Sequence, residues 1–219
     1  MKKVILIYSG GLDSTVLLYQ LLAAGDYVKC LSVDYGQRHR KELDAARCFA
    51  GRLGIEHRVA GLSGLRPLLA GNSLTTDELL VPEGHYTDES MKLTIVPNRN
   101  MVMLAVAAAW AISTKADAVA YAAQAGGHTI YPDCREAFID AMRQAFHLAD
   151  WHEVGLMAPF SHYTKKEIVL IGQHLSVPFG ETWSCYKGGA FHCGKCGTCV
   201  KRREAFDQAQ VPDPTEYER

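Results

Sequence analysis

A glycine pair directly after the first apolar segment is the feature that most constrains the fold. Residues 4–8 form a continuous apolar, β-rich run, which predicts a strand covered on both faces. Gly10 and Gly11 end this strand, and the spacing of the following leucines predicts a helix over 13–24. The chain therefore begins with a strand–loop–helix unit, the place where doubly wound α/β folds bind nucleotides.

The loop of this unit, SGGLDST, has the chemistry of a phosphate site. Glycines let a ligand approach the backbone closely, and the N–H groups at a helix N-terminus attract anions. Ser9, Ser14 and Thr15 add hydroxyl donors, and Asp13 indicates a Mg²⁺ ion or an oriented water. The loop is neither a Walker A motif nor a GxGxxG fingerprint. The alternative interpretation is a tight turn in which Ser and Asp cap the helix.

Strands and helices continue to alternate along the chain, which predicts a doubly wound, parallel five-stranded sheet with helices on both faces. Further strands are predicted at 28–34, 56–59, 118–122 and 154–157. Further helices are predicted at 41–53, 100–113, 134–148, 164–175 and 200–208, with Thr164 as an N-cap. Residues 61–97 are rich in Gly and Pro, so we expect an irregular insertion with one short helix near 65–70.

Four of the seven cysteines lie close together near the C-terminus: Cys185, Cys193, Cys196 and Cys199. Four thiolates with two-residue spacers suit tetrahedral Zn²⁺ in a closed, structural site, with an iron–sulfur cluster as the alternative. His192 is an awkward replacement ligand because it adjoins Cys193. Cys134 is expected to be a small buried thiol rather than a nucleophile. We expect a domain over 1–180 and a zinc-binding segment over 181–219 packed on it.

SGGLDST resembles the pyrophosphate loop of the N-type ATP pyrophosphatases (the PP-loop superfamily), enzymes that cleave ATP to AMP and diphosphate. The resemblance implies the adenine nucleotide alpha hydrolase-like fold, with Mg²⁺ bridging the phosphates of ATP. It assigns ATP binding to Tyr8, Ser9, Gly10, Gly11, Leu12, Asp13, Ser14, Thr15, Val16, Leu17 and Leu18.

Further motifs narrow the resemblance. DYGQRH (34–39), VPNRN (96–100), YPDCR (131–135) and WSCY (183–186) follow the loop in this order. Together they resemble the 7-cyano-7-deazaguanine synthase family from residue 4 to about 206. The family implies an ATP-dependent ligase of queuosine biosynthesis that converts 7-carboxy-7-deazaguanine and ammonia to the nitrile. ATP would first adenylate the carboxylate and later the amide.

The same motifs supply candidate site residues. Arginine side chains are planar, bidentate donors that suit a carboxylate or phosphate, and Asp133 can accept the paired N–H donors of a guanine-like edge. Each arginine taken alone is more typical of a solvated surface charge, whereas three arginines beside Pro or Gly turns at strand ends favour a site. The resemblance places substrate binding at Tyr35, Gln37, Arg38, Arg99, His128, Tyr131, Asp133 and Arg135. It places catalysis at Asp13, Ser14, Lys165 and Arg99.

The chain departs from the family pattern in two places. Residues 124–130 lack the acidic residue that we expect before YPDCR, and His128 would substitute as a polar contact or proton shuttle. Asn98 stands where a glycine is expected before Arg99. The alternative is therefore a paralogue that stops at the amide, or one that couples the adenylated carboxylate to another amine.

The charge balance indicates which kinds of partner the protein is expected to bind. With 23 basic and 24 acidic residues the net charge is −1, so no overall field favours nucleic acid or an acidic membrane. A tRNA-modifying PP-loop enzyme is therefore disfavoured. A zinc-knuckle nucleic-acid binder is disfavoured because it would leave the phosphate loop unexplained. With no membrane segment and no glutaminase domain in the sequence, we expect a cytoplasmic enzyme that uses free or partner-delivered ammonia. We also expect Trp183, Tyr186 and Lys187 near the pocket.

An oligomer is also expected. The apolar runs 68–69 and 79–81 in the insertion suit a homodimer contact, as the family resemblance implies. They could equally be covered within the monomer.

Overall fold

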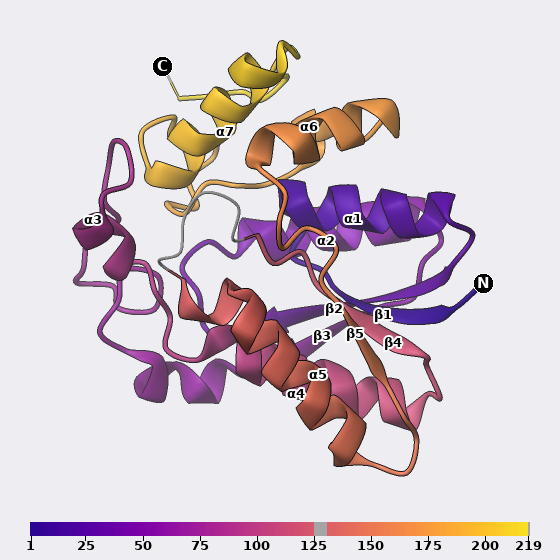
Figure 1. Cartoon of the computed structure of the whole chain (residues 1–219). Helices are drawn as coiled ribbons and strands as arrows, with labels where there is room; N and C mark the ends of the chain where they lie inside the picture. The colour runs from indigo at the N-terminus through magenta and orange to yellow at the C-terminus, as the bar shows by residue number, and fades with distance from the viewer. Residues whose placement is uncertain (125–130, 219) are drawn as a thin grey trace.

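A parallel sheet of five strands forms the centre of the molecule (Figure 1). The structure is a computed structural model that describes residues 1–124 and 131–218. The strands are β1 (Lys3–Ile7), β2 (Tyr27–Asp34), β3 (His57–Gly61), β4 (Ala118–Ala120) and β5 (Gly155–Met157). They lie in the order β3-β2-β1-β4-β5, which confirms the predicted parallel sheet.

Helices cover both faces of the sheet because each strand buries alternate residues on opposite sides. Val4 and Leu6 of β1 pack into one apolar core with α1 (Leu12–Ala23), α2 (Lys41–Arg52) and α6 (Lys165–His174). Ile5 packs into a second core with α4 (Arg99–Ser113) and α5 (Glu136–Ala149). Figure 1 shows these two helical layers above and below the strands.

The strand order creates a crevice at the carboxyl end of β1. Val4 of β1 pairs with Val28 of β2 on one side and with Ala118 of β4 on the other. The chain therefore leaves β1 in one direction and later returns to its opposite side. Open α/β sheets bind their ligands at such a switch point, and the SGGLDST loop lies here.

The element boundaries follow the predicted ones within two residues, with one exception. Thr164 caps α6 through a capping box with Glu167, as predicted. A 3₁₀ turn over Pro132–Cys134 precedes α5, which moves the start of α5 to Glu136. The exception is α7 (Gly197–Ala209), which begins three residues earlier than expected because Cys196 serves as its N-cap.

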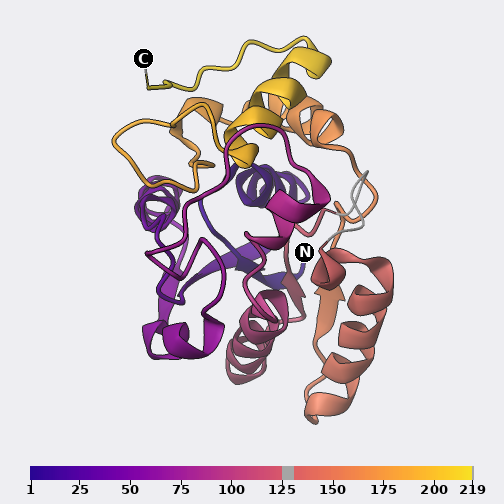
Figure 2. The same ribbon diagram turned by 90° about the vertical axis from the view of Figure 1, so that its left-hand side faces the viewer.

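The insertion over 61–97 contains more structure than the sequence predicts. The expected short helix is a 3₁₀ helix at Ser63–Leu69, and an additional helix, α3 (Asp88–Lys92), was not predicted. Thr87 and Ser90 form a capping box that stabilises this short helix. The segment before α3 reaches the C-terminal region (Figure 2). There the backbone of Glu83 forms an isolated antiparallel β-bridge with that of Cys196.

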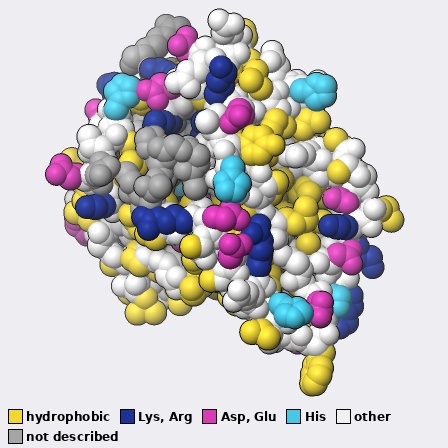
Figure 3. Space-filling model, viewed as in Figure 1, with side chains coloured by type: hydrophobic (Ala, Val, Ile, Leu, Met, Phe, Trp, Pro, Cys, Tyr) yellow, Lys and Arg dark blue, Asp and Glu magenta, His cyan; other side chains and the backbone are white. Residues whose placement is uncertain are grey.

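The C-terminal helix completes the molecule. Ala205 and Phe206 of α7 share one apolar core with Val16 of α1 and Ile168 of α6. On the face seen in Figure 3, basic side chains are interspersed with acidic ones and do not form a continuous stripe. Within the described ranges, none of the helices combines the length and apolar character needed to cross a membrane.

Candidate active site and metal centre

The phosphate loop joins the end of β1 to the first turn of α1. Gly10 has a φ of 75°, and a Cβ atom there would lie 2.5 Å from the carbonyl oxygen of Glu42. A side chain at this position would strain the backbone and clash with the first turn of α2. Gly10 therefore lets the loop pack directly against α2.

Hydroxyl groups hold the loop in shape. Thr15 Oγ1 donates a hydrogen bond to the carbonyl oxygen of Gly11 at 2.8 Å, and Ser14 Oγ donates to the same oxygen at 3.2 Å. The backbone N–H of Gly11 donates to Ser9 Oγ at 3.2 Å. These contacts order the loop through its own side chains, so its N–H groups are positioned before an anion arrives.

Only part of the expected ATP-binding stretch faces open space. A cavity of about 480 Å³ is lined by Tyr8, Ser9, Gly11, Leu12, Asp13 and Ser14. The core buries Thr15, Val16, Leu17 and Leu18 completely. The residues that line the cavity can therefore contact a nucleotide directly. The four fully buried residues instead anchor α1 in the core.

Asp13 and Lys165 meet across the cavity from α1 and α6. Lys165 Nζ donates a short hydrogen bond to Asp13 Oδ2, and both side chains are about three-quarters buried. The capping box of Thr164 fixes the first turn of α6 and thereby the position of Lys165. The other oxygen of Asp13, Oδ1, is buried and has no hydrogen-bond partner among the described residues. A buried, unpaired carboxylate oxygen beside an anion site fits a cation ligand.

The opposite end of the cavity is rich in tyrosine. Tyr35, Tyr86, Tyr131 and Tyr186 line it together with Arg99, whose Nη1 donates to the Tyr35 hydroxyl at 3.5 Å. Burial raises the pKa of Tyr35 and of Tyr186, so both hydroxyls stay protonated at neutral pH. In the part of the chain that the structure describes, no carboxylate forms an ion pair with Arg99. This end therefore offers a guanidinium and aromatic faces to a ligand.

Several predicted substrate residues do not line the cavity. Arg38 donates to the carbonyl oxygens of Thr76 and Asp77 in the insertion, at 3.0 and 2.7 Å. Gln37 is buried and holds the backbone of Tyr35 and Val33.

The residues of the YPDCR motif also differ in whether they line the cavity. Asp133 Oδ2 accepts from the backbone N–H of Asn100 at 3.3 Å, at the start of α4. Arg135 is exposed at the N-cap of α5, outside the described cavity lining. Tyr131 does line the cavity. His128 lies outside the described residues, as does most of the departing stretch 124–130, so its predicted role stays a prediction.

The cavity also contains residues that motif reasoning did not assign. The insertion contributes Tyr86 and Met91, α2 contributes Glu42, and α7 contributes Lys201 and Glu204. The expected approach of the C-terminal segment is confirmed for Trp183 and Tyr186, which line the cavity. Lys187 instead forms an ion pair with Glu83 on a separate groove. Only long-range folding brings these residues together, so spacing along the chain carried no signal for them.

Cys134 lies on the cavity wall beside Asn100. Asn100 Nδ2 donates to its Sγ at 3.5 Å. Burial raises the pKa of this thiol to about 11, with the Asp133 carboxylate adding to the shift. The group is therefore a thiol rather than a thiolate at neutral pH, which is the opposite of what an activated nucleophile needs.

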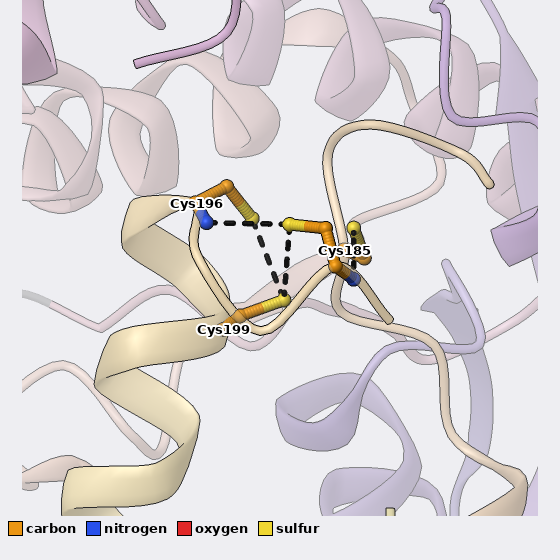
Figure 4. A group of neighbouring side chains, drawn as sticks. Cys185, Cys196 and Cys199 are labelled. Atoms are coloured by element: carbon orange, nitrogen blue, oxygen red, sulfur yellow. Dashed lines mark hydrogen bonds between the residues drawn. The ribbon is translucent and has the colours of Figure 1, made fainter. Parts of the chain in front are cut away.

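The four C-terminal cysteines form one buried cluster (Figure 4). Their sulfur atoms all lie within 4.8 Å of one another, with Cys196 and Cys199 at 3.5 Å and Cys193 and Cys199 at 4.0 Å. Sulfur ligands at ~2.3 Å from a tetrahedral ion are separated by about 3.8 Å. The backbone N–H groups of Lys195 and Cys196 also point at Cys193 Sγ, at 3.4 and 3.3 Å. The arrangement of the four sulfur atoms thus suits a tetrahedral metal ion.

His192 does not belong to this cluster. Its Nε2 accepts a hydrogen bond from the backbone N–H of Ser184 at 3.0 Å, and its ring stacks on Trp183. Trp183 in turn donates its backbone N–H to the carbonyl oxygen of Gly10 at 3.0 Å. The metal segment is therefore connected directly to the phosphate loop.

Comparison with known proteins gives a consistent result at the level of sequence. The family model described as Queuosine biosynthesis protein QueC matches residues 3–210. The 7-cyano-7-deazaguanine synthase of Rhizobium meliloti (strain 1021) is 54% identical over 218 residues, covering 99% of this chain and 92% of the relative. That of Paracoccus denitrificans (strain Pd 1222) is 51% identical and covers 99% of this chain and 93% of the relative.

Solved structures show the same fold at low identity. A predicted tRNA methyltransferase subunit from Methanocaldococcus jannaschii superposes with a TM-score of 0.52 at 14% identity, over 100% of this chain and 93% of the other. A 4-thiouridine synthetase, solved with RNA and bound ATP, gives 0.50 at 17% identity, over 80% and 40% of the two chains. At this identity the likeness concerns the fold alone.

Proposed function

The chain belongs to the family of the queuosine biosynthesis protein QueC, and we propose from its cavity how it performs the reaction of that family. It is an ATP-dependent carbon–nitrogen ligase, a 7-cyano-7-deazaguanine synthase like its relatives. The substrates are 7-carboxy-7-deazaguanine and ammonia. The observation that carries the assignment of residues is that one cavity joins the phosphate loop to a tyrosine- and arginine-lined end.

The phosphate loop end holds ATP. A carboxylate is a poor electrophile, so its oxygen first attacks the α-phosphorus and diphosphate leaves. The N–H groups at the start of α1 and the hydroxyls of Ser9 and Ser14 bind the departing phosphates. Lys165 neutralises charge that develops on them, and its contact with Asp13 keeps its ammonium group at the loop.

A divalent cation fits beside the loop. Asp13 Oδ1 is buried without a hydrogen bond in the described structure, and Asp13 lines the cavity together with Ser9 and Ser14. Mg²⁺ prefers such oxygen ligands, shared with substrate phosphates. When bound, it would offset the phosphate charge during diphosphate departure.

The tyrosine end holds the deazaguanine. Tyr35, Tyr131 and Tyr186 offer aromatic faces to a planar base, and Arg99 offers bidentate donors to its carboxylate. Gln37, Arg38 and Asp133 then act by shaping the walls rather than by direct contact. Gln37 fixes Tyr35, Arg38 fixes the insertion and Asp133 fixes the start of α4.

Two further assignments complete the proposal. The cysteine cluster holds one structural Zn²⁺, because four protein ligands leave no open position for chemistry. It organises a segment over 181–219 that packs on the domain of residues 1–180. Such a reduced thiolate cluster and the use of ATP both suit the cytoplasm.

A homodimer is also proposed. Leu68 and Leu80 of the insertion are 78% and 86% exposed, whereas their neighbours Leu69 and Val81 are buried within the monomer. Paired burial would remove the two exposed leucines from water. Light scattering of the purified protein should give twice the mass of the chain. A double L68E/L80E variant should give the monomer mass, and an unchanged dimer would exclude this surface.

Product analysis tests the reaction. The protein is incubated with ATP, Mg²⁺, ammonium and 7-carboxy-7-deazaguanine, and the products are identified by mass spectrometry. We expect the nitrile and AMP. Accumulation of the amide alone would indicate an enzyme that stops halfway, and absence of AMP would contradict the proposal.

A variant of the phosphate loop tests the site. Asp13→Asn should lower AMP formation by about 10²-fold or more, since it removes a charged group from the transition state. The control Asp44→Asn alters an exposed carboxylate that forms an ion pair with Arg47 on the surface of α2. It should leave the rate unchanged, and equal losses in both variants would remove Asp13 from the mechanism.

A further inference from the structure

Three carboxylates line the described part of the cavity, and one of them is without a strong cation partner. Asp13 pairs with Lys165. Glu204 contacts His85 at 2.8 Å and Lys201 at 3.7 Å. Glu42 forms no ion pair with a lysine or arginine of the described chain, and only His39 lies within ion-pair distance, at 3.3 Å.

The side chain of Glu42 is held from one side. Gln37 Nε2 donates to Glu42 Oε1 at 3.1 Å, and His39 Nε2 lies at 3.3 Å from the same oxygen. Gln37 is fixed in turn by Val33 and Tyr35, and His39 stacks on Tyr186 with ring centroids 5.1 Å apart. None of the described residues donates a hydrogen bond to Oε2. One oxygen is therefore anchored while the other remains available to a ligand.

Glu42 lies between the two ends of the cavity. Its backbone carbonyl packs against Gly10 of the phosphate loop. Its charge acts on Tyr35 and Tyr186, where it adds to the effect of burial in raising their pKa. Tyr35 contacts Arg99. The carboxylate thus lines the cavity between the phosphate loop and the end that holds Tyr35 and Arg99.

A partly buried carboxylate with an available oxygen and aromatic neighbours is a site for a small cation. The established reaction uses ammonia, which is present mainly as ammonium at neutral pH. We propose that Glu42 is the ammonium-binding residue of this enzyme and the acceptor of the protons that nitrogen loses. This inference rests on the proposed function and adds to it the place where the second substrate binds.

The step balances as follows. Bound ammonium gives one proton to the Glu42 carboxylate, which returns it to water. The nitrogen lone pair forms the C–N bond to the adenylated carbon, and the C–O bond to AMP breaks, with AMP taking the electron pair. A second proton leaves nitrogen by the same route, and the amide remains. His39 and Gln37 act as positioning residues because they hold Oε1.

In this proposal Glu42 takes the place of the acidic residue that the family pattern predicts in the stretch 124–130 and that this chain lacks there. The cavity does contain a carboxylate between its two ends, and α2 supplies it from a different part of the chain.

The test compares ammonia use with adenylation in Glu42→Gln, which keeps the shape of the side chain and an oxygen for Gln37. The KM for ammonium should rise at least about 10-fold and the rate of amide and nitrile formation should fall by about 10²-fold. Exchange of labelled diphosphate into ATP, dependent on the deazaguanine substrate, should stay within about 3-fold because adenylation precedes ammonia. Glu42→Asp, which keeps the charge, should recover part of the loss.

The matched control is Asp44→Asn, an exposed carboxylate on the same helix as Glu42, which forms an ion pair with Arg47 outside the cavity. Its KM for ammonium should be unchanged. Hydroxylamine gives a second readout, because this amine is neutral at pH 7 and does not need a cation site. Hydroxamate formation should therefore fall much less than amide formation in Glu42→Gln.

The outcomes separate the two proposals. A wild-type protein without diphosphate exchange or AMP would contradict the proposed function itself. If the wild type is active but Glu42→Gln keeps the wild-type KM for ammonium, the ammonium site is refuted. Equal loss of exchange, amide and hydroxamate in Glu42→Gln would likewise refute it, since the residue would then serve folding or ATP binding.

Discussion

At the scale of single residues, neighbouring positions of one motif have separate tasks. In DYGQRH, Tyr35 lines the cavity while Gln37 is buried beneath it and Arg38 reaches the insertion. The motif was predictable as a unit, but the direction of each side chain was not, because it depends on the segments that fold against it. The sequence did not indicate a role for Glu42 in the site, because in the segment KELDAARC it resembles a charged residue on the solvent-facing side of a helix.

The tail after α7 gives a prediction at this scale. Asp213 accepts hydrogen bonds from the Tyr217 hydroxyl at 2.5 Å and the Thr215 backbone, and it pairs with the buried Arg202 at 3.4 Å. Burial alone would raise the pKa of Asp213, but these hydrogen bonds and the Arg202 charge outweigh it and hold the pKa below 3.8. The group therefore contributes stability above its ordinary pKa, and this contribution is lost as the pH falls through the lowered value.

Asp213→Asn should accordingly unfold at a lower urea concentration than the wild type at pH 7. The difference between the two proteins should shrink below about pH 4, where the wild-type carboxylate also begins to lose its charge. Urea unfolding at a series of pH values measures it. Asp207→Asn, an exposed neighbour on α7, serves as the control. A difference that is independent of pH would show that charge is not the cause.

At the scale of elements, local signals determined most of the fold. Apolar strands, capping residues and glycine stops placed the strands and helices within two residues, apart from the start of α7. That helix begins inside the cysteine cluster because Cys196 acts as its N-cap, and a metal-ligand motif gives no helix signal at this position. The helix α3 was missed because Thr87 and Ser90 form a short capping box without an apolar period.

The packing of α6 on α1 gives a prediction at this scale. A Cβ atom at Gly172 of α6 would lie 2.7 Å from Val16 of α1 and 2.5 Å from Phe179. Gly172→Ala should therefore destabilise the protein by about 1–3 kcal/mol, because the core is overpacked. Gly51 of α2 has nothing within 4 Å, so Gly51→Ala should stabilise the protein by about 0.5–1 kcal/mol through helix propensity. Urea denaturation measures both, and equal signs would contradict the packing argument.

At the scale of the whole molecule, segments that are distant in the sequence build one cavity. The phosphate loop comes from the first residues, Tyr86 from the insertion and the α7 wall from the last fifth of the chain. The sequence allowed the phosphate loop and the cysteine cluster to be predicted from spacing alone. It did not reveal that Tyr86 packs on Gly197, where an added Cβ would lie 2.4 Å from the tyrosine ring. Such contacts arise only in the folded chain.

Metal removal gives the prediction at this scale. Elemental analysis should find one zinc per chain, and Cys199→Ser should lose it. Because structural zinc contributes several kcal/mol to folding, the melting temperature should fall on the order of 10 °C. Hydrogen exchange should increase over 181–218 while β1 and β2 stay protected.

The exposed Cys48 supplies the control. Cys48→Ser should keep both the metal and the melting temperature. A Cys199→Ser protein that retains zinc would refute the site.

The position of α7 has a consequence for the order of events during synthesis. Every strand of the sheet lies before residue 158, so the sheet can assemble while the ribosome is still adding residues. The helix α7, which forms one wall of the cavity, ends at Ala209 and begins inside the cysteine cluster, with Cys199 in its first turn. A nascent chain can therefore be largely folded and still unable to hold its substrates. Substrate binding becomes possible last, once α7 has packed against α1 and α6.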